Sequence, residues 1–146
     1  MPKGEVYTYD SNEVSVVACS IPIDGGWAED DFIAIAQDSN DYDDVVTVDG
    51  DVVVSKTNDL RATVTLRLIQ TARANSLLSA LRNLGLGAPN GAGMGVFQVR
   101  DGNGTLLHFA EKSWIMKPPE IVFGKTAKGR EWSIRVGRLL RNDGGV

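Results

Sequence analysis

The chain has 146 residues, a formal net charge of −4, and 42% hydrophobic and 23% charged residues, which suits one folded, soluble domain spanning residues 1–146. Its single cysteine, Cys19, excludes an internal disulfide, and its single histidine, His108, leaves little for a metal site. No run approaches the ~20 apolar residues of a membrane helix, and the first ten residues lack an apolar signal core, so we expect neither a membrane partner nor cleavage for export.

Two apolar stretches near the N-terminus predict a pair of strands. Residues 13–23, EVSVVACSIPI, are rich in β-branched residues, and residues 31–37, DFIAIAQ, alternate in polarity. The IDGGW sequence between them has the composition of a turn, so we expect 31–37 to return against 13–23. Cys19 lies inside the first apolar run and is expected to be a buried small hydrophobe rather than a nucleophile.

Residues 45–54, VVTVDGDVVV, predict a β-hairpin. Valine-rich arms flank Asp49-Gly50, a pair suited to the positive φ angles of a tight turn. Both faces of the hairpin are valine-rich, so we expect it to project over about residues 38–60 and to need another subunit to cover its apolar area. The alternative is that it folds back onto its own sheet.

Charge is divided unevenly along the chain. Between Asp24 and Asp59 there are eleven acidic residues and one basic residue, whereas the remainder has eight acidic and fourteen basic residues. Identical copies stacked end to end would gain from this polarity, because an acidic edge of one copy would face a basic edge of the next. A solvated acidic loop is the alternative interpretation.

The middle of the chain predicts a strand, a helix and a loop. Residues 61–70, RATVTLRLIQ, alternate strictly, with Arg61 and Arg67 on the polar side. Residues 75–85 predict a helix that Asn75 or Ser76 caps and Gly85 ends. Residues 85–95, GLGAPNGAGMG, predict a flexible surface loop. On the strand, the residues expected to face the core are Ala62, Val64, Leu66 and Leu68. On the helix, the leucine stripe expected to cover a sheet consists of Leu77, Leu78, Leu81 and Leu84.

The C-terminal third returns to alternation of period two. Residues 95–115 predict two strands around a DGNG turn, and residues 130–140 predict a last strand with Trp132, Ile134 and Val136 on one face. The fold class is therefore mainly β: an antiparallel sandwich or open barrel with one helix covering a face or an end.

The candidate motifs for catalysis and ligand binding lack the residue spacing that such sites require. The Gly-Lys-Thr at 124–126 would need a glycine at 119 to form a phosphate loop, but Pro119 stands there and a strand rather than a helix follows. Calcium-loop registers starting at Asp38 or Asp41 lack the required ligands and glycine, which leaves a looser calcium site as the alternative. No serine–histidine or cysteine–histidine set is supported, so we expect no enzyme and no cofactor.

Three long stretches resemble the tail tube proteins of contractile-tailed bacteriophages. They are residues 6–42, 55–84 and 113–139, and their most specific parts are TNDLRATVTLRLIQT, NSLLSAL and KPPEIVFGKTAKGREW. The order and spacing of these parts carry the resemblance over nearly the whole chain. The glycine-rich GLGAPNGAGMGVF at 85–97 departs from the family pattern.

The resemblance implies hexameric rings that stack into an inner tail tube. Strands of each subunit would join an inter-subunit β-barrel around a lumen that conducts double-stranded DNA. The implied partners are further copies of the chain, the tail sheath, the baseplate or tube initiator, the terminator, the tape measure protein, and DNA passing through the lumen. The implied location is the virion tail, assembled in the cytoplasm of the host bacterium.

Combining this resemblance with the residue patterns gives two sets of candidate site residues. The inter-ring interface is expected to involve Val45, Val46, Asp49, Val52, Val53 and Val54. A DNA conduit should not hold its cargo, so we expect a net-negative lumen, with carboxylates from Asp30, Asp31, Asp38, Asp41, Asp43 and Asp44. Arg61 and Arg67 fit a lumen only if neighbouring carboxylates pair with them. Alternatives are a terminator, a baseplate hub, a bacteriocin tube or a monomeric β-sandwich that binds a ligand.

Overall fold

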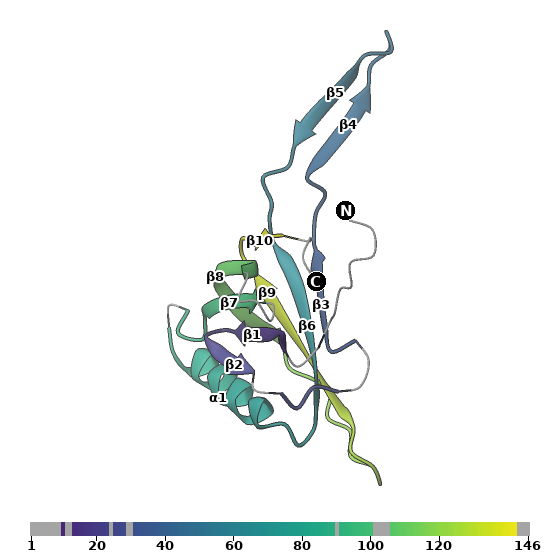
Figure 1. Ribbon diagram of the computed structural model, residues 1–146. Coiled ribbons are helices and arrows are strands. Elements are labelled where there is room, and N and C mark those ends of the chain that lie inside the picture. Colours follow the sequence, from purple (N-terminus) through teal and green to yellow (C-terminus); the bar gives the residue numbers. More distant parts are fainter. Residues whose placement is uncertain are drawn as a thin grey trace.

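An antiparallel sheet of eight strands forms the body of the protein (Figure 1). The computed structural model describes residue 10 and residues 13–23, 25–28, 31–89, 91–100 and 106–142. Seven strands follow the order β2-β1-β7-β8-β9-β6-β3, and β10 pairs beside β8. The strand bounds are β1 Ser15–Ala18, β2 Ile21–Ile23, β3 Ile33–Gln37, β6 Ala62–Ile69, β7 Gly95–Arg100, β8 Leu106–Lys117, β9 Gly129–Val136 and β10 Leu140–Arg141.

Three further elements complete the fold. Strands β4 (Tyr42–Val46) and β5 (Val52–Lys56) form a separate two-stranded sheet that stands away from the body, while helix α1 (Arg73–Gly87) lies against the body near β2 (Figure 1). Among the described residues, no helix has the length and apolar content needed to cross a membrane.

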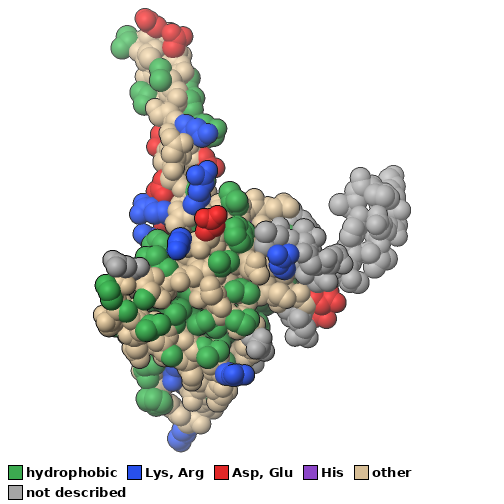
Figure 2. Space-filling view, turned by 90° about the vertical axis from the view of Figure 1, so that its left-hand side faces the viewer, with side chains coloured by type: hydrophobic (Ala, Val, Ile, Leu, Met, Phe, Trp, Pro, Cys, Tyr) green, Lys and Arg blue, Asp and Glu red, His purple; other side chains and the backbone are tan. Residues whose placement is uncertain are grey.

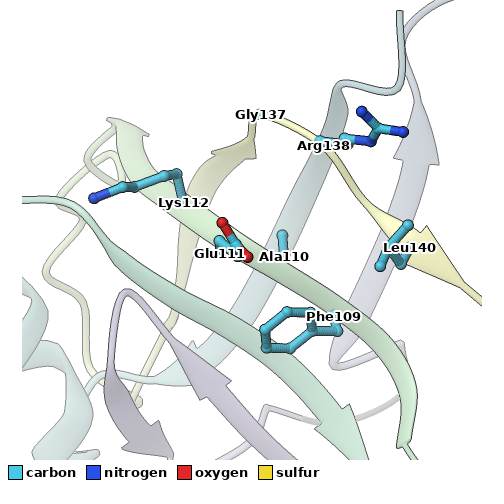
Figure 3. A pocket seen from close by; sticks show the side chains of 7 residues that line it. All are labelled: Phe109, Ala110, Glu111, Lys112, Gly137, Arg138 and Leu140. Atoms are coloured by element: carbon cyan, nitrogen blue, oxygen red, sulfur yellow. The ribbon is translucent and has the colours of Figure 1, made fainter.

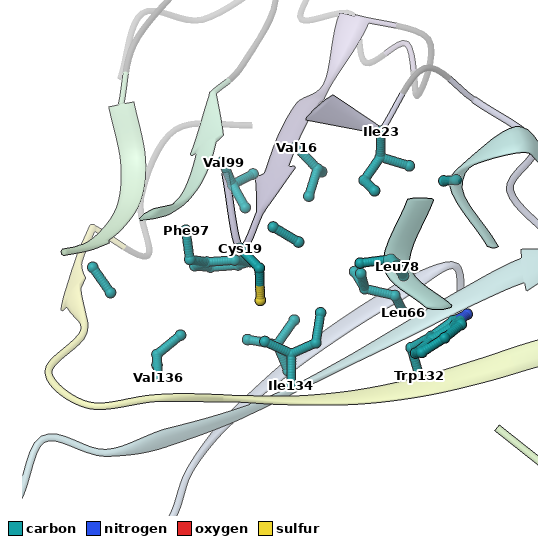
Figure 4. Close-up of a cluster of buried hydrophobic side chains, with 14 of the residues drawn as sticks. Val16, Cys19, Ile23, Leu66, Leu78, Phe97, Val99, Trp132, Ile134 and Val136 are labelled. Atoms are coloured by element: carbon teal, nitrogen blue, oxygen red, sulfur yellow. The ribbon is translucent and has the colours of Figure 1, made fainter. Parts of the chain in front are cut away.

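The core lies between two halves of the same bent sheet (Figure 4). The predicted alternation of β6 is confirmed, because Ala62, Val64, Leu66 and Leu68 are buried. Register pairs Val64 with Ile134 and Leu66 with Trp132, so β6 and β9 present one apolar surface. The opposite half contributes Val16, Ala18, Phe97 and Val99 from β1 and β7. The predicted class, mainly antiparallel β with one helix, is confirmed.

The prediction of one strand over 13–23 is wrong, because the chain reverses at Cys19-Ser20. Both residues have positive φ (51° and 67°), and Ala18 pairs with Ile21 across a two-residue turn. Ser113 Oγ accepts a hydrogen bond from the Cys19 N–H (3.3 Å), and a Cβ on Gly95 would lie 2.4 Å from the Cys19 carbonyl carbon. Packing against β7 and β8 thus holds a turn that has no glycine of its own. Cys19 is buried as predicted, and that burial raises the pKa of its thiol.

The predicted partner of residues 31–37 is also wrong. Strand β3 pairs with β6, in register from Ile33 opposite Leu66 to Gln37 opposite Ala62, and not with β1 or β2. Strand β1 pairs instead with β7, through Val16 opposite Val99. The sheet therefore ends at β3 on one side and at β2 on the other.

Helix α1 is longer than the predicted 75–85 and uses fewer leucines. It begins at Arg73 without a side-chain cap and continues past Gly85. Leu78 is buried and Leu81 packs partly against the core, but Leu77 and Leu84 are exposed. The stripe is narrower than predicted because α1 covers one corner of the body rather than a broad sheet face. Asn75, predicted as a possible cap, instead accepts a hydrogen bond from the Trp132 indole N–H (2.9 Å) and donates one to the Ile69 carbonyl (2.8 Å).

The C-terminal region differs from the prediction in one respect. The strand predicted for 130–140 breaks after Val136, and β10 turns to pair with β8 through Leu140 opposite Phe109. Trp132, Ile134 and Val136 share the core face as predicted. The DGNG turn lies outside the described residues. The Gly-Lys-Thr at 124–126 lies in an irregular segment that leads into strand β9, so a strand rather than a helix follows it, as predicted.

Candidate assembly interface

Residues 42–56 form a hairpin, called the hairpin below, whose turn is longer than the two-residue turn predicted at Asp49-Gly50. The Thr47 N–H donates to the Asp51 carbonyl (2.7 Å), which leaves a three-residue loop from Val48 to Gly50. Among the residues of this loop, only Gly50 has a positive φ (88°). The arrangement is typical of a three-residue hairpin loop that ends on a left-handed glycine.

Every residue of β4 and β5 is exposed. The adjacent strand positions alternate between the two faces, so one face presents the cross-strand pair Val45 and Val53, and the other presents Val46 and Val52. Val48 at the tip is fully exposed, at 105% of its reference area. The hairpin thus displays apolar area on both faces, without any contact to the core cluster.

A polar network ties the base of the hairpin to the body. Asp59 accepts two hydrogen bonds from the Arg61 guanidinium, both at 2.9 Å, and one from the Ser39 hydroxyl (2.8 Å). These bonds hold the pKa of the Asp59 carboxyl well below its usual range, with the Arg61 hydrogen bond as the largest cause. Gln37 Nε2 donates to Asp41 Oδ1 (2.7 Å) on the neighbouring chain segment. The base is therefore fixed by directed contacts, although the hairpin above it is not packed.

The structure does not gather the predicted lumen carboxylates into one cluster. Asp38 is mostly covered, with its side chain 18% exposed, and pairs with Arg135 (3.1 Å) and with the Thr63 hydroxyl (2.8 Å). Asp43 and Asp44 are neighbours on β4 and so point to opposite faces of the hairpin. The carbonyl of Asp31 accepts a hydrogen bond from Arg67 (2.7 Å), and Asp30 lies outside the described residues.

Strands β6 and β9 share a polar face on the side of the sheet away from the core. Register places Thr63 beside Arg135 and Arg67 beside Glu131. Arg67 Nε lies 3.5 Å from Glu131 Oε2, and Arg135 pairs with Asp38. Both arginines of this face, as well as Arg61, therefore have carboxylate partners.

An irregular segment of residues 118–128, called the arm below, extends from the end of the body that lies away from the hairpin (Figure 1). The hairpin joins the body at the start of β6, and the arm is tied to the end of β6 because the Lys128 N–H donates to Gln70 Oε1 (3.0 Å). The eight residues of β6 separate these attachments by roughly 26 Å. Ile121, Val122 and Phe123 of the arm are exposed, and Phe123 is 81% exposed. The sequence prediction missed this surface because its short apolar run lies between prolines and glycine and has no periodicity.

Two grooves lie at the two ends of the body. One, of about 520 Å³, lies beside β8 and β10 at the hairpin end, with Phe109 and Leu140 on its walls and Glu111, Lys112 and Arg138 at its rim (Figure 3). The other, of about 280 Å³, lies between α1 and the arm. Within the described parts of the chain, no three histidine, cysteine, aspartate or glutamate side chains come together as a metal site would require.

The amino-acid sequence matches a known family. The family model described as "Bacteriophage PhiTE tail tube protein" matches residues 14–142. The chain belongs to this family. No curated protein sequence matches it.

The fold of this tail tube family member is shared with solved contractile injection machines. Its structure is similar to the anti-feeding prophage tube terminating cap (TM-score 0.57, 9% identity, 96% of this chain and 94% of that one). It is also similar to a chain of the PVC sheath/tube terminator of an extracellular contractile injection system (0.58, 12%, 94% and 98%). A third similarity is to a chain of the PVC sheath-tube complex in the extended state (0.56, 11%, 93% and 92%). The chain is thus a structural component of a phage tail, with the fold found in such machines.

Proposed function

We propose that this tail protein forms hexameric rings that stack into the inner tube of a contractile tail and conduct double-stranded DNA. The observation that carries the proposal is the hairpin, whose ten strand residues are all exposed. Apolar area of this extent favours burial against another chain. Val45, Val46, Val52, Val53 and Val54 supply that area, with Asp49 at the tip setting the charge of the contact.

Ring formation would also cover the two open edges of the sheet. Among the described residues, strand β3 at one end of the strand order and β2 at the other each have a neighbouring strand on one side only. Pairing or covering these edges with neighbouring subunits would close an inter-subunit β-barrel and protect the backbone groups from aggregation. Six subunits per ring follow the family resemblance.

The polar face of β6 and β9 is our candidate for the lumen wall. Duplex DNA carries about one negative charge per ~1.7 Å of axis, so unpaired cations would hold it electrostatically. The arginines of this face are neutralised by Glu131 and Asp38. Further carboxylates from the 30–44 region would then leave the lumen net negative, so that DNA stays centred and mobile.

In a tube, each ring must bind another ring at both of its ends, whereas a terminator ring needs to bind at only one end. The hairpin at one end and the exposed apolar arm at the other meet the requirement of a repeating stack (Figure 1). A terminator ring is the second candidate, because two of the similar solved chains are described as a terminating cap and a terminator. In either case, the partners we propose are the sheath, the baseplate, the tape measure protein and transient DNA, with assembly in the host cytoplasm.

Negative-stain microscopy of the purified chain tests this proposal. We expect hollow tubes of variable length that grow with protein concentration. Single rings of uniform height would favour the terminator, and particles of one subunit would favour the monomeric binding module and end the tube proposal.

Charge reversal on the polar face gives a prediction about DNA. We expect tubes of Glu131→Lys to retain duplex DNA at low salt and release it as salt rises, because Arg67 loses its partner and each subunit gains a cation. Wild-type tubes should not bind, as measured by co-sedimentation at several salt concentrations. Glu13→Lys, an equal charge change at an exposed site just before β1, is the matched control. Binding by the control alone would place the lumen on another face.

A further inference from the structure

The groove between α1 and the arm, called the arm groove below, is basic and apolar. Helix α1 supplies one wall and the start of the arm supplies the other, at the end of the body away from the hairpin (Figure 1). Its two charged residues are both arginines, Arg82 and Arg130. Its lining consists of Asn75, Ser79, Arg82, Asn83, Pro118, Pro119, Ile121, Arg130 and Trp132.

Arg130 is a buried cation without a carboxylate partner among the described residues. It is 9% exposed. Its guanidinium donates to the Val122 carbonyl (3.4 Å) and lies 5.6 Å from the centre of the Phe123 ring. These contacts are a long hydrogen bond and a cation–π contact, and neither neutralises the charge. A buried charge is costly unless it is paired, so the groove favours a ligand that brings a carboxylate.

The tip of the hairpin has the complementary chemistry. Val48 at the tip is fully exposed, and Asp49 and Asp51 flank Gly50 beside it, while Asp43 and Asp44 lie farther down on β4. Figure 2 shows acidic side chains at this tip, and basic side chains both around the base of the hairpin and at the opposite end of the molecule. The arm also carries the exposed cations Lys125 and Lys128 and one exposed anion, Glu120, which stands between the lining residues Pro119 and Ile121. An acidic apolar projection and a basic apolar groove thus lie at opposite ends of one chain.

We propose that the hairpin tip of one copy docks in the arm groove of a second copy in the next ring. Val48 would bury against Ile121 and the prolines, while Asp49 or Asp51 would pair with Arg82 and Arg130. The contact uses different surfaces on the two copies, so it repeats head to tail and extends a stack without limit. This inference rests on the proposed function, since it names the surface that receives the hairpin.

The groove beside β8 and β10 is a poorer receptor for the tip. It shares Arg138 with the hollow at the base of the hairpin, so it lies at the same end of the body as the hairpin itself. Its rim carries Glu111 beside Lys112 and Arg138 (Figure 3), so it is less basic than the arm groove, whose two charged lining residues are both arginines. A cysteine in that groove is therefore a matched control for a cysteine in the arm groove.

Cysteine cross-linking of assembled tubes tests the docking site. We expect Val48→Cys combined with Pro119→Cys to give a ladder of covalent multimers under mild oxidant, because a disulfide needs Cα atoms within about 7 Å. Val48→Cys with Glu111→Cys, and Val48→Cys alone, should give no ladder. Cys19 is 2% exposed and does not compete. A ladder from the Glu111 pair, or none from the Pro119 pair in intact tubes, overturns the docking site while the tube proposal stands.

If the cysteine variants do not assemble, charge reversal tests the docking site instead. We expect Arg82→Glu and Asp49→Arg each to lose tubes, and the two changes combined in one chain to restore them, because the pair is re-formed with opposite signs. Both sites are at least partly exposed, so the folding of each variant is checked by thermal unfolding. Failure of the combined variant to assemble overturns the docking site. Absence of tubes from the wild-type chain overturns the tube proposal itself, and the docking site with it.

Discussion

Val53→Asp should leave the subunit folded and prevent it from forming tubes. Val53 lies opposite Val45 on the hairpin and is exposed in the single chain, so an aspartate there disturbs no core contact. In a stacked ring the same side chain would be buried, where an unpaired carboxylate costs on the order of several kcal/mol. A loss of ~3 kcal/mol per contact weakens association by more than ~100-fold. Sedimentation and negative-stain microscopy measure the loss, and thermal unfolding checks the fold.

The control for this variant is Val53→Thr, which keeps the branched shape and the strand preference without a charge. It should assemble nearly as well as the wild type. If Val53→Asp forms tubes of normal length, the hairpin is not buried by a neighbour and its assigned role in stacking is wrong.

Phe97→Ala should be the most damaging single change to the fold. Phe97 is fully buried between the two halves of the sheet, near Cys19, Ile134 and Val136 (Figure 4). Removing its ring leaves a cavity that a closed β core cannot fill, at an expected cost of about 3–5 kcal/mol in the free energy of unfolding. That is a large part of the stability of an ordinary domain, so ring and tube formation should fail with it.

Denaturant unfolding of the subunit at low protein concentration measures this cost. Phe97→Leu, which refills most of the volume, should lose less than half as much. A loss below ~1 kcal/mol for Phe97→Ala would mean that the two halves of the sheet do not close on this ring.

The sequence predicts a strand best where one face is buried along its whole length. Strand β6 shows this, because each apolar residue from Ala62 to Leu68 faces the core and each residue between them faces away. The Cys19-Ser20 turn could not be predicted, since neither residue favours positive φ and the turn is held by Ser113 and Gly95, which lie far along the chain. The turn is therefore specified by tertiary contacts and not by its local sequence.

Strand pairing and helix coverage failed for a related reason. Residues 31–37 have the pattern of a half-buried strand, but the pattern does not specify which neighbour supplies the hydrogen bonds, and the partner is β6 rather than β1. The leucine spacing of α1 predicts a helix, yet Leu77 and Leu84 remain exposed because the surface beneath the helix is narrow. The length and hydrophobic periodicity of a segment predict whether it forms a strand or a helix, whereas the contacts between these elements depend on the whole chain.

The candidate site was predictable only on its hairpin side. Valines on both faces of a short hairpin are a sequence signal, because such a strand pair lacks a polar face for water. The arm has no such signal, since Ile121, Val122 and Phe123 could equally have been buried. That no carboxylate of the described residues pairs with Arg130 depends on where β9 lies relative to α1 and the arm, so it emerges only from the structure.

A reconstruction of the assembled particle by cryo-electron microscopy is the most direct test of stacking through the hairpin. The account requires residues 42–56 of each subunit to lie against a subunit of the adjacent ring, with Val53 out of contact with solvent. Density that places this segment in solvent, or against the sheet of its own chain, would contradict it.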